Sequence, residues 1–470
     1  MTNFLTHVHG FLWGAPVLVL ILGTGIYLTV RTNCVQIAFL PRAMADFCRK
    51  LVGQRREGEV SSFQALCTAL AATVGTGNLV GVAGAICLGG PGAIFWMWVC
   101  GFLGMAVKYA EVTLAVRFRC REKGEYIGGP MHMICRGMGE TWKWLAGLYS
   151  FFGVVACLGV GNAAQINAVI SAVNDVLMRM GSEPSKGRNL ILGLVLAVLI
   201  GAVMLGGAKR IGRAAELLIP VVSGAYIMLC LFALTANFQR IPQALAAILQ
   251  GAFAPRAVTG GMLGSAFQAL KIGCSRGVFT NEAGMGTASI AHASANTSHP
   301  AEQGLMGIME VFLDTILICT LTALVILTSG VPIPYGVDLG GQLTMDAFVS
   351  VYGNWVAVFL AAALGCFAFA TVLGWGLYGA RCAQFLFGPK VWNRFAFLQT
   401  VTVFAGAVLN TGTVWLLAET FNGLMAVPNL IALAVLSPEL CRLTIEYKQK
   451  SDGIAVSGGN YADFHQCKPL

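Results

Sequence analysis

Two stretches of this 470-residue chain combine glycine with polar side chains in an otherwise strongly apolar sequence. They read VGTGNLVG (Val74 to Gly81) and GCSRGVFTNEAGMG (Gly273 to Gly286), one in each half of the chain. Glycine lets a helix open, and the freed N–H and C=O groups can then bind a ligand. N–H groups at a helix start attract a carboxylate, while carbonyl and hydroxyl oxygens accept from an ammonium group. The chemistry predicted is the binding of a zwitterion.

In the first stretch, Gly75 and Gly77 let the backbone approach a ligand, and Thr76 and Asn78 can satisfy the freed groups. Close helix packing is the alternative, because Gly77 and Gly81 form a small-xxx-small pair. The interleaved polar residues and the matching stretch in the second half favour a binding site.

In the second stretch we expect the helix to break around Ile272 and Gly273. The polar residues that follow include Arg276 and Glu282, six positions apart. Ionisable groups inside a membrane are costly and therefore candidates for function. We interpret these two as an inner gate or a structural ion pair, and not as ligands of the substrate.

The elements that must carry these residues are membrane-spanning helices. The chain is 57% hydrophobic and only 11% charged, against about 25% charged in a typical soluble domain. Uncharged runs recur at about the 20-residue length that spans a bilayer. We count eleven: 12–30, 64–88, 92–117, 145–174, 189–208, 214–236, 262–289, 304–328, 347–380, 395–418 and 420–440. The ninth is long enough to hold a surface helix before its span. An all-α, multi-pass protein of the cell membrane is predicted.

The net charge of +9 reflects orientation in the membrane. With the N-terminus outside and the C-terminus in the cytoplasm, 22 of the 30 lysines and arginines fall in inward segments and five in outward loops. Cytoplasmic loops carry this excess. No basic cluster is interleaved with aromatics, so nucleic acid is not an expected partner.

The domain organisation follows from the two broken spans. Residues 1–63 hold an additional first span and a cytoplasmic linker, and residues 441–470 form a cytoplasmic tail. The ten remaining spans divide into repeats of five, 64–236 and 237–440, each beginning with a glycine-broken span. Under this topology the two broken spans enter from opposite sides, as in an inverted repeat.

Four segments carry a resemblance to a known family. The run ALAATVGTGNLVGVAGAICLGGPGAIFWMWVCGFLGMAVKYAE (Ala69 to Glu111) resembles the signature of the alanine or glycine:cation symporters, within the amino acid-polyamine-organocation superfamily. GGPMHMI (Gly128 to Ile134), SRGVFTNEAGMGTASIAHA (Ser275 to Ala293) and FAFATVLGWGLYGARC (Phe367 to Cys382) are similar to it in the same order. The resemblance implies a leucine-transporter-like fold of two inverted five-helix repeats.

The resemblance also implies a function. The family members are symporters that import a small neutral amino acid, alanine or glycine, with sodium or a proton by alternating access. Sodium is the expected coupling ion, proton coupling is the alternative, and no other cofactor is expected. The expected partners are the amino acid, the ion and the lipid bilayer.

Several site residues are implied by the same resemblance. Gln165 matches a substrate-contacting glutamine of the family, and Ile272 and Gly273 match positions that line the substrate. Thr371 and Trp375, four residues apart, share one helix face. Trp375 is expected to cap the substrate cavity, although packing alone is the alternative.

An ion site is implied beside the substrate. In related folds, a hydroxyl at the position of Thr371 binds sodium, and carbonyls near Ala72, Thr73 and Val74 complete the oxygen shell. Hard cations prefer such oxygens. One departure stands at Ala370, where many relatives have serine or threonine, so the sequence leaves sodium and proton both open.

An enzyme and a channel are the rival classes. Gly273 to Gly277 matches GxSxG, which in hydrolases holds a nucleophilic Ser275 on a strand-to-helix turn. That context is absent in an apolar helical run, and a serine nucleophile needs a nearby base. We therefore expect no enzyme activity. A channel would favour repeated pore loops in a multimer, which paired broken helices in one chain do not resemble.

Overall fold

The computed structural model describes residues 2–14, 16–52, 60–122, 124–254, 266–408 and 412–451. Nearly all of these residues are helical, as the sequence predicts. The helices of the first half are α1 (Thr2–Leu12), α2 (Pro16–Arg31), α3 (Val35–Ala38), α4 (Leu40–Val52), α5 (Ser62–Thr73), α6 (Val82–Gly89), α7 (Gly92–Arg117), α8 (Pro130–Met133), α9 (Lys143–Leu158), α10 (Ala164–Arg179), α11 (Lys186–Met204) and α12 (Gly207–Ala236).

The second half has the same all-helical character. Its helices are α13 (Ile241–Phe253), α15 (Ala266–Asn281), α16 (Thr287–His292), α17 (Pro300–Val311), α18 (Thr320–Thr328), α19 (Gly341–Tyr352), α20 (Trp355–Phe387), α21 (Trp392–Val408), α22 (Gly412–Val435) and α23 (Ser437–Ser451). Short π-helical turns interrupt several spans, at Gly77–Gly81, Ile134–Met138, Gly159–Ala163 and Phe312–Cys319. Single 3-10 turns lie at Glu140–Trp142, Phe238–Arg240 and Pro389–Val391. A small antiparallel hairpin of β1 (Cys120–Glu122) and β2 (Glu125–Ile127) pairs Cys120 with Ile127.

The number of spans agrees with the sequence. In the described chain, seven helical segments are long and apolar enough to cross a membrane, and up to nine if each of two bent pairs counts as one span. Helices α15, with 16 described residues, and α21, with 17, fall just below that length and bring the total to the expected eleven. The long ninth run holds a separate helix, α19, before the span α20.

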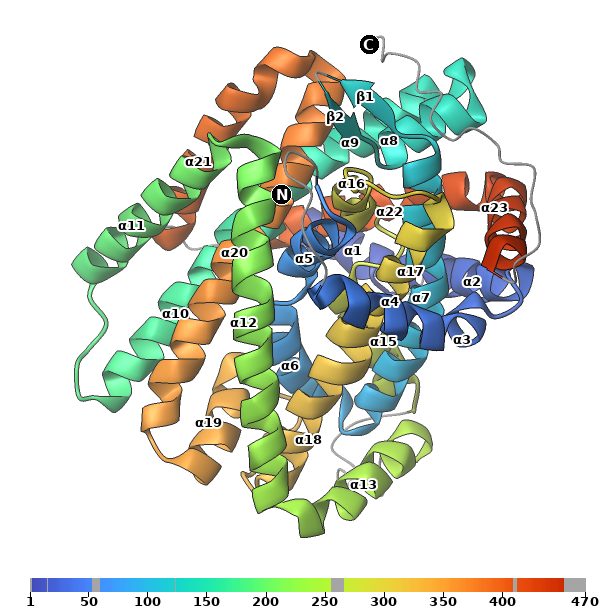
Figure 1. Cartoon of the computed structure of the whole chain (residues 1–470). Helices are drawn as coiled ribbons and strands as arrows, with labels where there is room; N and C mark the ends of the chain where they lie inside the picture. Colours follow the sequence, from blue (N-terminus) through green and yellow to red (C-terminus); the bar gives the residue numbers. More distant parts are fainter. Residues whose placement is uncertain are drawn as a thin grey trace.

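Burial separates the central helices from those that face lipid. In α7, 83% of the most apolar window is buried inside the protein, whereas in α12 only 28% is. Apolar surface can stay exposed on α12 because hydrocarbon, not water, surrounds a spanning helix. Figure 1 shows α5 and α6 at the centre, with α12 and α20 on one side and α7, α15 and α17 on the other. The interrupted pair α5–α6 is therefore enclosed by other helices.

Local sequence explains where α5 starts. The Ser61 hydroxyl accepts from the N–H of Gln64 at 2.9 Å, which satisfies one of the free donors at the helix start. From Ala65 to Thr73 every residue of α5 is buried, so this helix contacts protein around its whole circumference. A break in such a helix exposes its backbone to a protein cavity and not to lipid.

Candidate binding site at two interrupted helices

The first interruption separates α5 from α6, which meet at an angle of 49°. Helix α5 ends at Thr73, and the π-helical turn that begins at Gly77 leads into α6. Between them the N–H of Gly75 donates to Oδ1 of Asn78 at 2.8 Å. In a continuous helix this N–H would donate to the carbonyl of Ala71. The break therefore takes a helical donor away from the end of α5.

Asn78 braces this interruption from within the protein. Its side chain is fully buried, and its Nδ2 donates to Oδ1 of Asp314 at 2.7 Å and to the Asp314 carbonyl at 3.2 Å. The other carboxylate oxygen of Asp314 accepts from the hydroxyl of Thr315 at 2.8 Å. The sequence predicts Asn78 as a substrate ligand. In the structure it is not among the residues that line the small cavity described below, and it accepts from the N–H of Gly75, which does line that cavity.

The second interruption lies between α15 and α16, at Glu282 to Gly286. Backbone φ angles are positive at Glu282 (53°), Gly284 (96°) and Gly286 (76°). A left-handed conformation is unusual for a residue with a side chain, so the surrounding contacts must hold Glu282 in place. The expected break at Ile272 and Gly273 is wrong in its position, because α15 remains helical until Asn281.

Ile272 and Gly273 serve helix packing. A Cβ added at Gly273 would lie 2.3 Å from the carbonyl oxygen of Ala93, so α15 needs glycine to pack against α7. Ile272 packs on α6, because a Cβ added at Gly89 would lie 3.1 Å from the Cβ of Ile272. Small residues allow this close approach of membrane helices. The sequence therefore predicts the correct segment for the second interruption, but the helix opens at Glu282, nine residues after Gly273.

Glu111 on α7 holds the second interruption. Its Oε1 accepts three hydrogen bonds, from the N–H groups of Gly284 at 2.9 Å and Gly286 at 3.0 Å and from Nδ2 of Asn429 at 2.7 Å. These N–H groups have no helical acceptor, since the helix is open here. The carboxylate therefore supplies the acceptor that the break removes.

A small cavity lies between the two interruptions. Its lining residues are Ala72, Thr73, Gly75, Thr76, Gly77, Val160, Gln165, Phe279, Glu282, Thr371, Trp375 and Asn422. Eight of these twelve residues are predicted from the sequence. Of the other predicted residues, Val74 and Asn78 are chain neighbours of lining residues. Ile272 and Gly273 are not among the residues that line the cavity. The volume is about 20 Å³, which is about enough for one water molecule. The walls must move apart to admit an amino acid.

Gln165 and Thr76 close one side of this cavity. Gln165 follows the π-helical turn Gly159–Ala163 and begins α10. Its Oε1 accepts from the Thr76 hydroxyl at 3.1 Å, and its Nε2 donates to the carbonyl of Val160 at 3.4 Å. The expected glutamine is therefore beside the first interruption, bonded to the residue that follows Gly75.

Trp375 and Glu282 close the opposite side. The indole Nε1–H donates to Oε1 of Glu282 at 2.9 Å, and the hydroxyl of Thr287 donates to Oε2 at 2.6 Å. The Trp375 ring lies against Gly161, where an added Cβ would come within 2.5 Å of it. The ring is thus held from two sides, and α20 is tied to the second interruption.

Thr371 faces the first interruption from α20. Its Oγ1 lies 2.9 Å from the position that a Cβ on Gly75 would take, and it donates to the Phe367 carbonyl at 2.9 Å. One turn further, Gly374 packs on Ala72, because a Cβ added at Gly374 would lie 3.0 Å from the Cβ of Ala72. The hydroxyl and the final turn of α5 therefore adjoin, and oxygens of this kind suit a hard cation.

Sequence reasoning missed three residues of the cavity, Val160, Phe279 and Asn422. It singled out a fourth, Glu282, but assigned it to a gate or an ion pair and not to the substrate site. Glu282 is the most consequential, because it brings a carboxylate to the cavity wall. Its signal in the sequence is an acidic residue directly before a glycine-rich turn, in the motif NEAGMG. Asn422 comes from α22, a helix for which no motif was assigned.

A larger cavity of about 520 Å³ adjoins the small one, and Thr76 and Phe279 line both. Across it, Nη2 of Arg276 lies 3.2 Å from a carboxylate oxygen of Asp338. Arg276 therefore pairs with the loop before α19 and not with Glu282. The expected ion pair between these two residues is therefore wrong, while a role in gating stays a prediction.

A buried group of charges lies on the other side of Glu282. Nζ of Lys108 is 3.3 Å from Oε1 of Glu310, whose Oε2 bonds to Nε2 of His292 at 3.0 Å. Gln303 contacts the second ring nitrogen, Nδ1, at 2.8 Å. All four side chains are inaccessible to solvent. The pairing of Lys108 with Glu310 satisfies charges that are otherwise too costly to bury.

The arrangement polarises the cavity. The C-terminal end of α5 and the carboxylate of Glu282 make one part negative, while the start of the helix that follows Gly75 makes the other part positive. A molecule with a cationic and an anionic end fits both parts. The negative end belongs to α5 and the positive end to the helical turn that leads into α6. One interruption therefore supplies both signs.

Comparison with known proteins places these features in one family. The pattern of the sodium:alanine symporter family matches residues 1–456. A sodium/alanine symporter, AgcS, of Methanococcus maripaludis is 44% identical over 438 residues, which cover 92% of this chain and 93% of that protein. A probable sodium/glutamine symporter, GlnT, of Bacillus subtilis is 36% identical, covering 96% of this chain and 93% of GlnT.

The fold is similar to that of a solved transporter. The crystal structure of MhsT in complex with L-phenylalanine matches with a TM-score of 0.55, at 15% identity, over 83% of this chain and 99% of that one. This likeness shows a leucine-transporter-type fold. With the family match over almost the whole length, it identifies a multi-pass membrane transporter and not an enzyme: this chain belongs to the sodium:alanine symporter family.

Proposed function

We propose that this symporter imports a small neutral amino acid, alanine or glycine, together with sodium. The single observation that carries the proposal is the small polarised cavity between the two interruptions. Its lining includes Val160, Phe279 and Trp375, bulky walls that favour a substrate with a short side chain. Its polar groups are few and convergent, as expected of a specific binding site.

The amino acid binds with its two charged ends at the two parts of the cavity. The carboxylate lies at the N–H groups of Gly75 to Gly77, where the helix that leads into α6 begins. The ammonium group faces the carboxylate of Glu282 and the last carbonyls of α5. Gln165 contributes an amide on the side of Thr76.

Sodium binds between α5 and α20. Its ligands are the carbonyls of Ala72, Thr73 and Val74 and the hydroxyl of Thr371. The close approach of Thr371 to Gly75 supports this site, because only glycine leaves space for an ion there. Ala370 is buried and offers no second hydroxyl, so the shell is completed by backbone oxygens.

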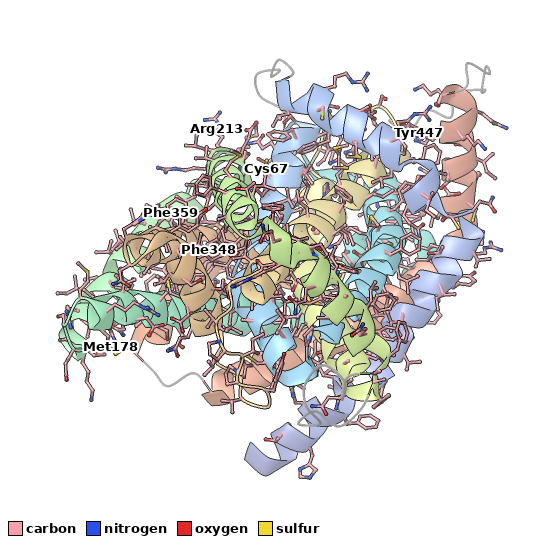
Figure 2. All side chains as sticks on the ribbon, turned by 90° about the horizontal axis from the view of Figure 1, so that it is seen from below. Cys67, Met178, Arg213, Phe348, Phe359 and Tyr447 are labelled. Atoms are coloured by element: carbon pink, nitrogen blue, oxygen red, sulfur yellow. The ribbon has the colours of Figure 1, made fainter. Side chains whose placement is uncertain are left out.

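Transport proceeds by alternating access in a fold with two repeats, residues 64–236 and 237–440. The interrupted helices at the start of each repeat support this division. We assign the cytoplasmic side to the face that carries Arg213 and Tyr447, with the N-terminus outside, because the cationic segments gather there. Figure 2 shows both residues at the same upper edge of the molecule.

One observation favours proton coupling as the second candidate. Glu282 lies between the cavity and the buried Lys108–Glu310–His292 group, a chain of groups that can carry a proton. In that case the proton would bind at Glu282 or Glu310 and not at Thr371.

Competition against labelled alanine tests the substrate class without depending on the driving ion. Purified protein in liposomes preloaded with alanine exchanges it for external labelled alanine. Unlabelled alanine, glycine, serine, D-alanine and glutamine are then each added outside in excess. We expect strong competition by the two smallest, glycine and alanine, and none by glutamine. Competition by glutamine alone would contradict the proposed size limit.

A further inference from the structure

Another cavity, of about 450 Å³, is lined by residues at the end of α2, in the α3–α4 segment and in α23, and it shares no residue with the substrate site. Three cationic side chains line it: Arg31, Arg42 and Lys448. Its lining contains no acidic residue. Among the described residues, no carboxylate oxygen lies within 4.0 Å of any of the three charges.

The acidic residues nearby are engaged with other cations. Asp46 pairs with Arg49, Glu302 with Lys50 at 3.0 Å, and Glu446 with Arg442 at 2.6 Å. The three cations of the cavity are therefore an uncompensated positive site. Such a concentration of charge attracts an anion.

The surroundings show that this site lies at the lipid surface. On α2, the side chains of Ile26 and Val30 are 55% and 69% exposed, and Arg31 follows directly at the helix end. On the adjoining segment, Ile37 and Met44 are also exposed, at 59% and 43%. Exposed apolar side chains next to cations mark a helix in the membrane interface.

The cavity is held in shape by contacts between its walls. The rings of Phe39 and Tyr447 lie 5.9 Å apart, which joins the α3–α4 segment to α23. The thiol of Cys441 donates to the carbonyl of Arg31 at 3.2 Å, which joins α23 to α2. Figure 2 shows Tyr447 near the blue helix α4.

We propose that this cavity binds the headgroup of an anionic glycerophospholipid. The phosphate is held by Arg31, Arg42 and Lys448, and the acyl chains run along the exposed apolar face of α2 past Val30 and Ile26. Basic pockets between membrane helices recognise lipid headgroups in this way. The site is independent of the amino-acid cavity and is a place where membrane composition acts on the transporter.

The test compares lipid binding by native mass spectrometry and the unfolding temperature in detergent with added phosphatidylglycerol or phosphatidylcholine. The variant is the triple change Arg31→Gln, Arg42→Gln and Lys448→Gln. Its matched control removes three exposed cations from the start of α12, at Lys209, Arg210 and Arg213.

We expect phosphatidylglycerol, and not phosphatidylcholine, to bind and to raise the unfolding temperature of the wild-type protein and the control. Each cation near a lipid surface contributes a factor of about five in binding, so the triple variant should lose the effect. Equal binding of the two lipids, or equal loss in the control, would overturn the proposal. So would the same stabilisation by inorganic phosphate alone, which would mean a free anion site.

Discussion

At the scale of single residues, the cavity depends on groups whose bonds are directed by their neighbours. Glu282 faces the cavity while Trp375 and Thr287 each donate to one of its oxygens. Both donors are neutral, so they orient the carboxylate without neutralising it. Among the described residues, no cationic side chain forms an ion pair with Glu282, and the buried Lys108 acts on it only over a longer distance. A substrate ammonium group is the direct partner that we propose for this carboxylate.

The change Glu282→Gln keeps the shape of the side chain and an oxygen for Trp375 but removes the charge. We expect alanine binding to weaken by at least tenfold, since a hydrogen bond to a charged group contributes about 1.5–3 kcal/mol. The dissociation constant, measured by calorimetry, checks this. Glu183→Gln, an exposed carboxylate in a loop, is the control. An unchanged affinity in a folded Glu282→Gln protein would remove Glu282 from the site.

Thr371→Ala tests the ion site at the same scale. Loss of one hydroxyl ligand should raise the sodium concentration for half-maximal uptake about tenfold or more. Preference among amino acids should stay the same, because the hydroxyl is assigned to the ion. Thr371→Ser restores the oxygen and should restore sodium affinity. If sodium dependence is the same in Thr371→Ala and in wild type, the assigned ion site is wrong.

At the scale of elements, the interruptions are supported by the helices behind them. Asn78 and Asp314 brace the first, and Glu111 on α7 braces the second. Neither support touches the small cavity. Helix α7 thus acts as the fixed frame of the second break, which explains why it is the most buried span of those measured in the described chain.

Glu111→Ala should destabilise the protein through the second interruption. The change leaves the N–H groups of Gly284 and Gly286 without an acceptor, at about 1–3 kcal/mol each. Asn429 loses one bond but still donates to the Gly284 carbonyl at 2.9 Å. The unfolding temperature should fall clearly, and alanine affinity should fall with it. Glu111→Gln retains an acceptor oxygen, so its unfolding temperature should lie between those of the wild type and Glu111→Ala. A drop in stability with unchanged affinity would limit Glu111 to a role in folding.

Gly161, in the turn between α9 and α10, allows a close approach to Trp375 on α20. In Gly161→Ala the new methyl would lie 2.5 Å from Trp375, so the ring must shift, and overpacking of this kind costs about 1–3 kcal/mol. We expect uptake to be largely lost. Gly147→Ala, on the same side of the fold in α9, meets no atom within 4 Å and should transport like wild type. Equal activity of the two variants would show that the ring position is unimportant.

At the scale of the whole molecule, the sequence predicts the architecture because membrane spans and their glycine-rich breaks are local features. The eleven apolar segments and the residues Thr73 to Gly77 belong to this class. Asn422 was missed and Glu282 was assigned to a gate or an ion pair, because the position of both at the cavity depends on how α15 and α22 pack. Gly273 was misplaced because glycine signals close packing as well as chain opening, and only the neighbouring Ala93 distinguishes the two.

In the proposed function, an amino acid and an ion pass through the same cavity. A zwitterion moving with one cation transfers net charge, worth about 2.3 kcal/mol per charge per 100 mV. Uptake should therefore respond to membrane potential as well as to the ion gradient. Both dependences are properties of the assembled protein and of no single residue.

The most direct measurement is uptake of labelled alanine into liposomes that contain the purified protein, under an inward sodium gradient, an inward proton gradient, or neither. We predict that alanine accumulates with the sodium gradient alone, that a negative interior potential increases this accumulation, and that none occurs without a gradient. Accumulation with protons alone would contradict the sodium site at Thr371 and move the coupling to Glu282 or Glu310. Absence of uptake with either gradient, by protein that still unfolds cooperatively, would contradict alanine as the substrate.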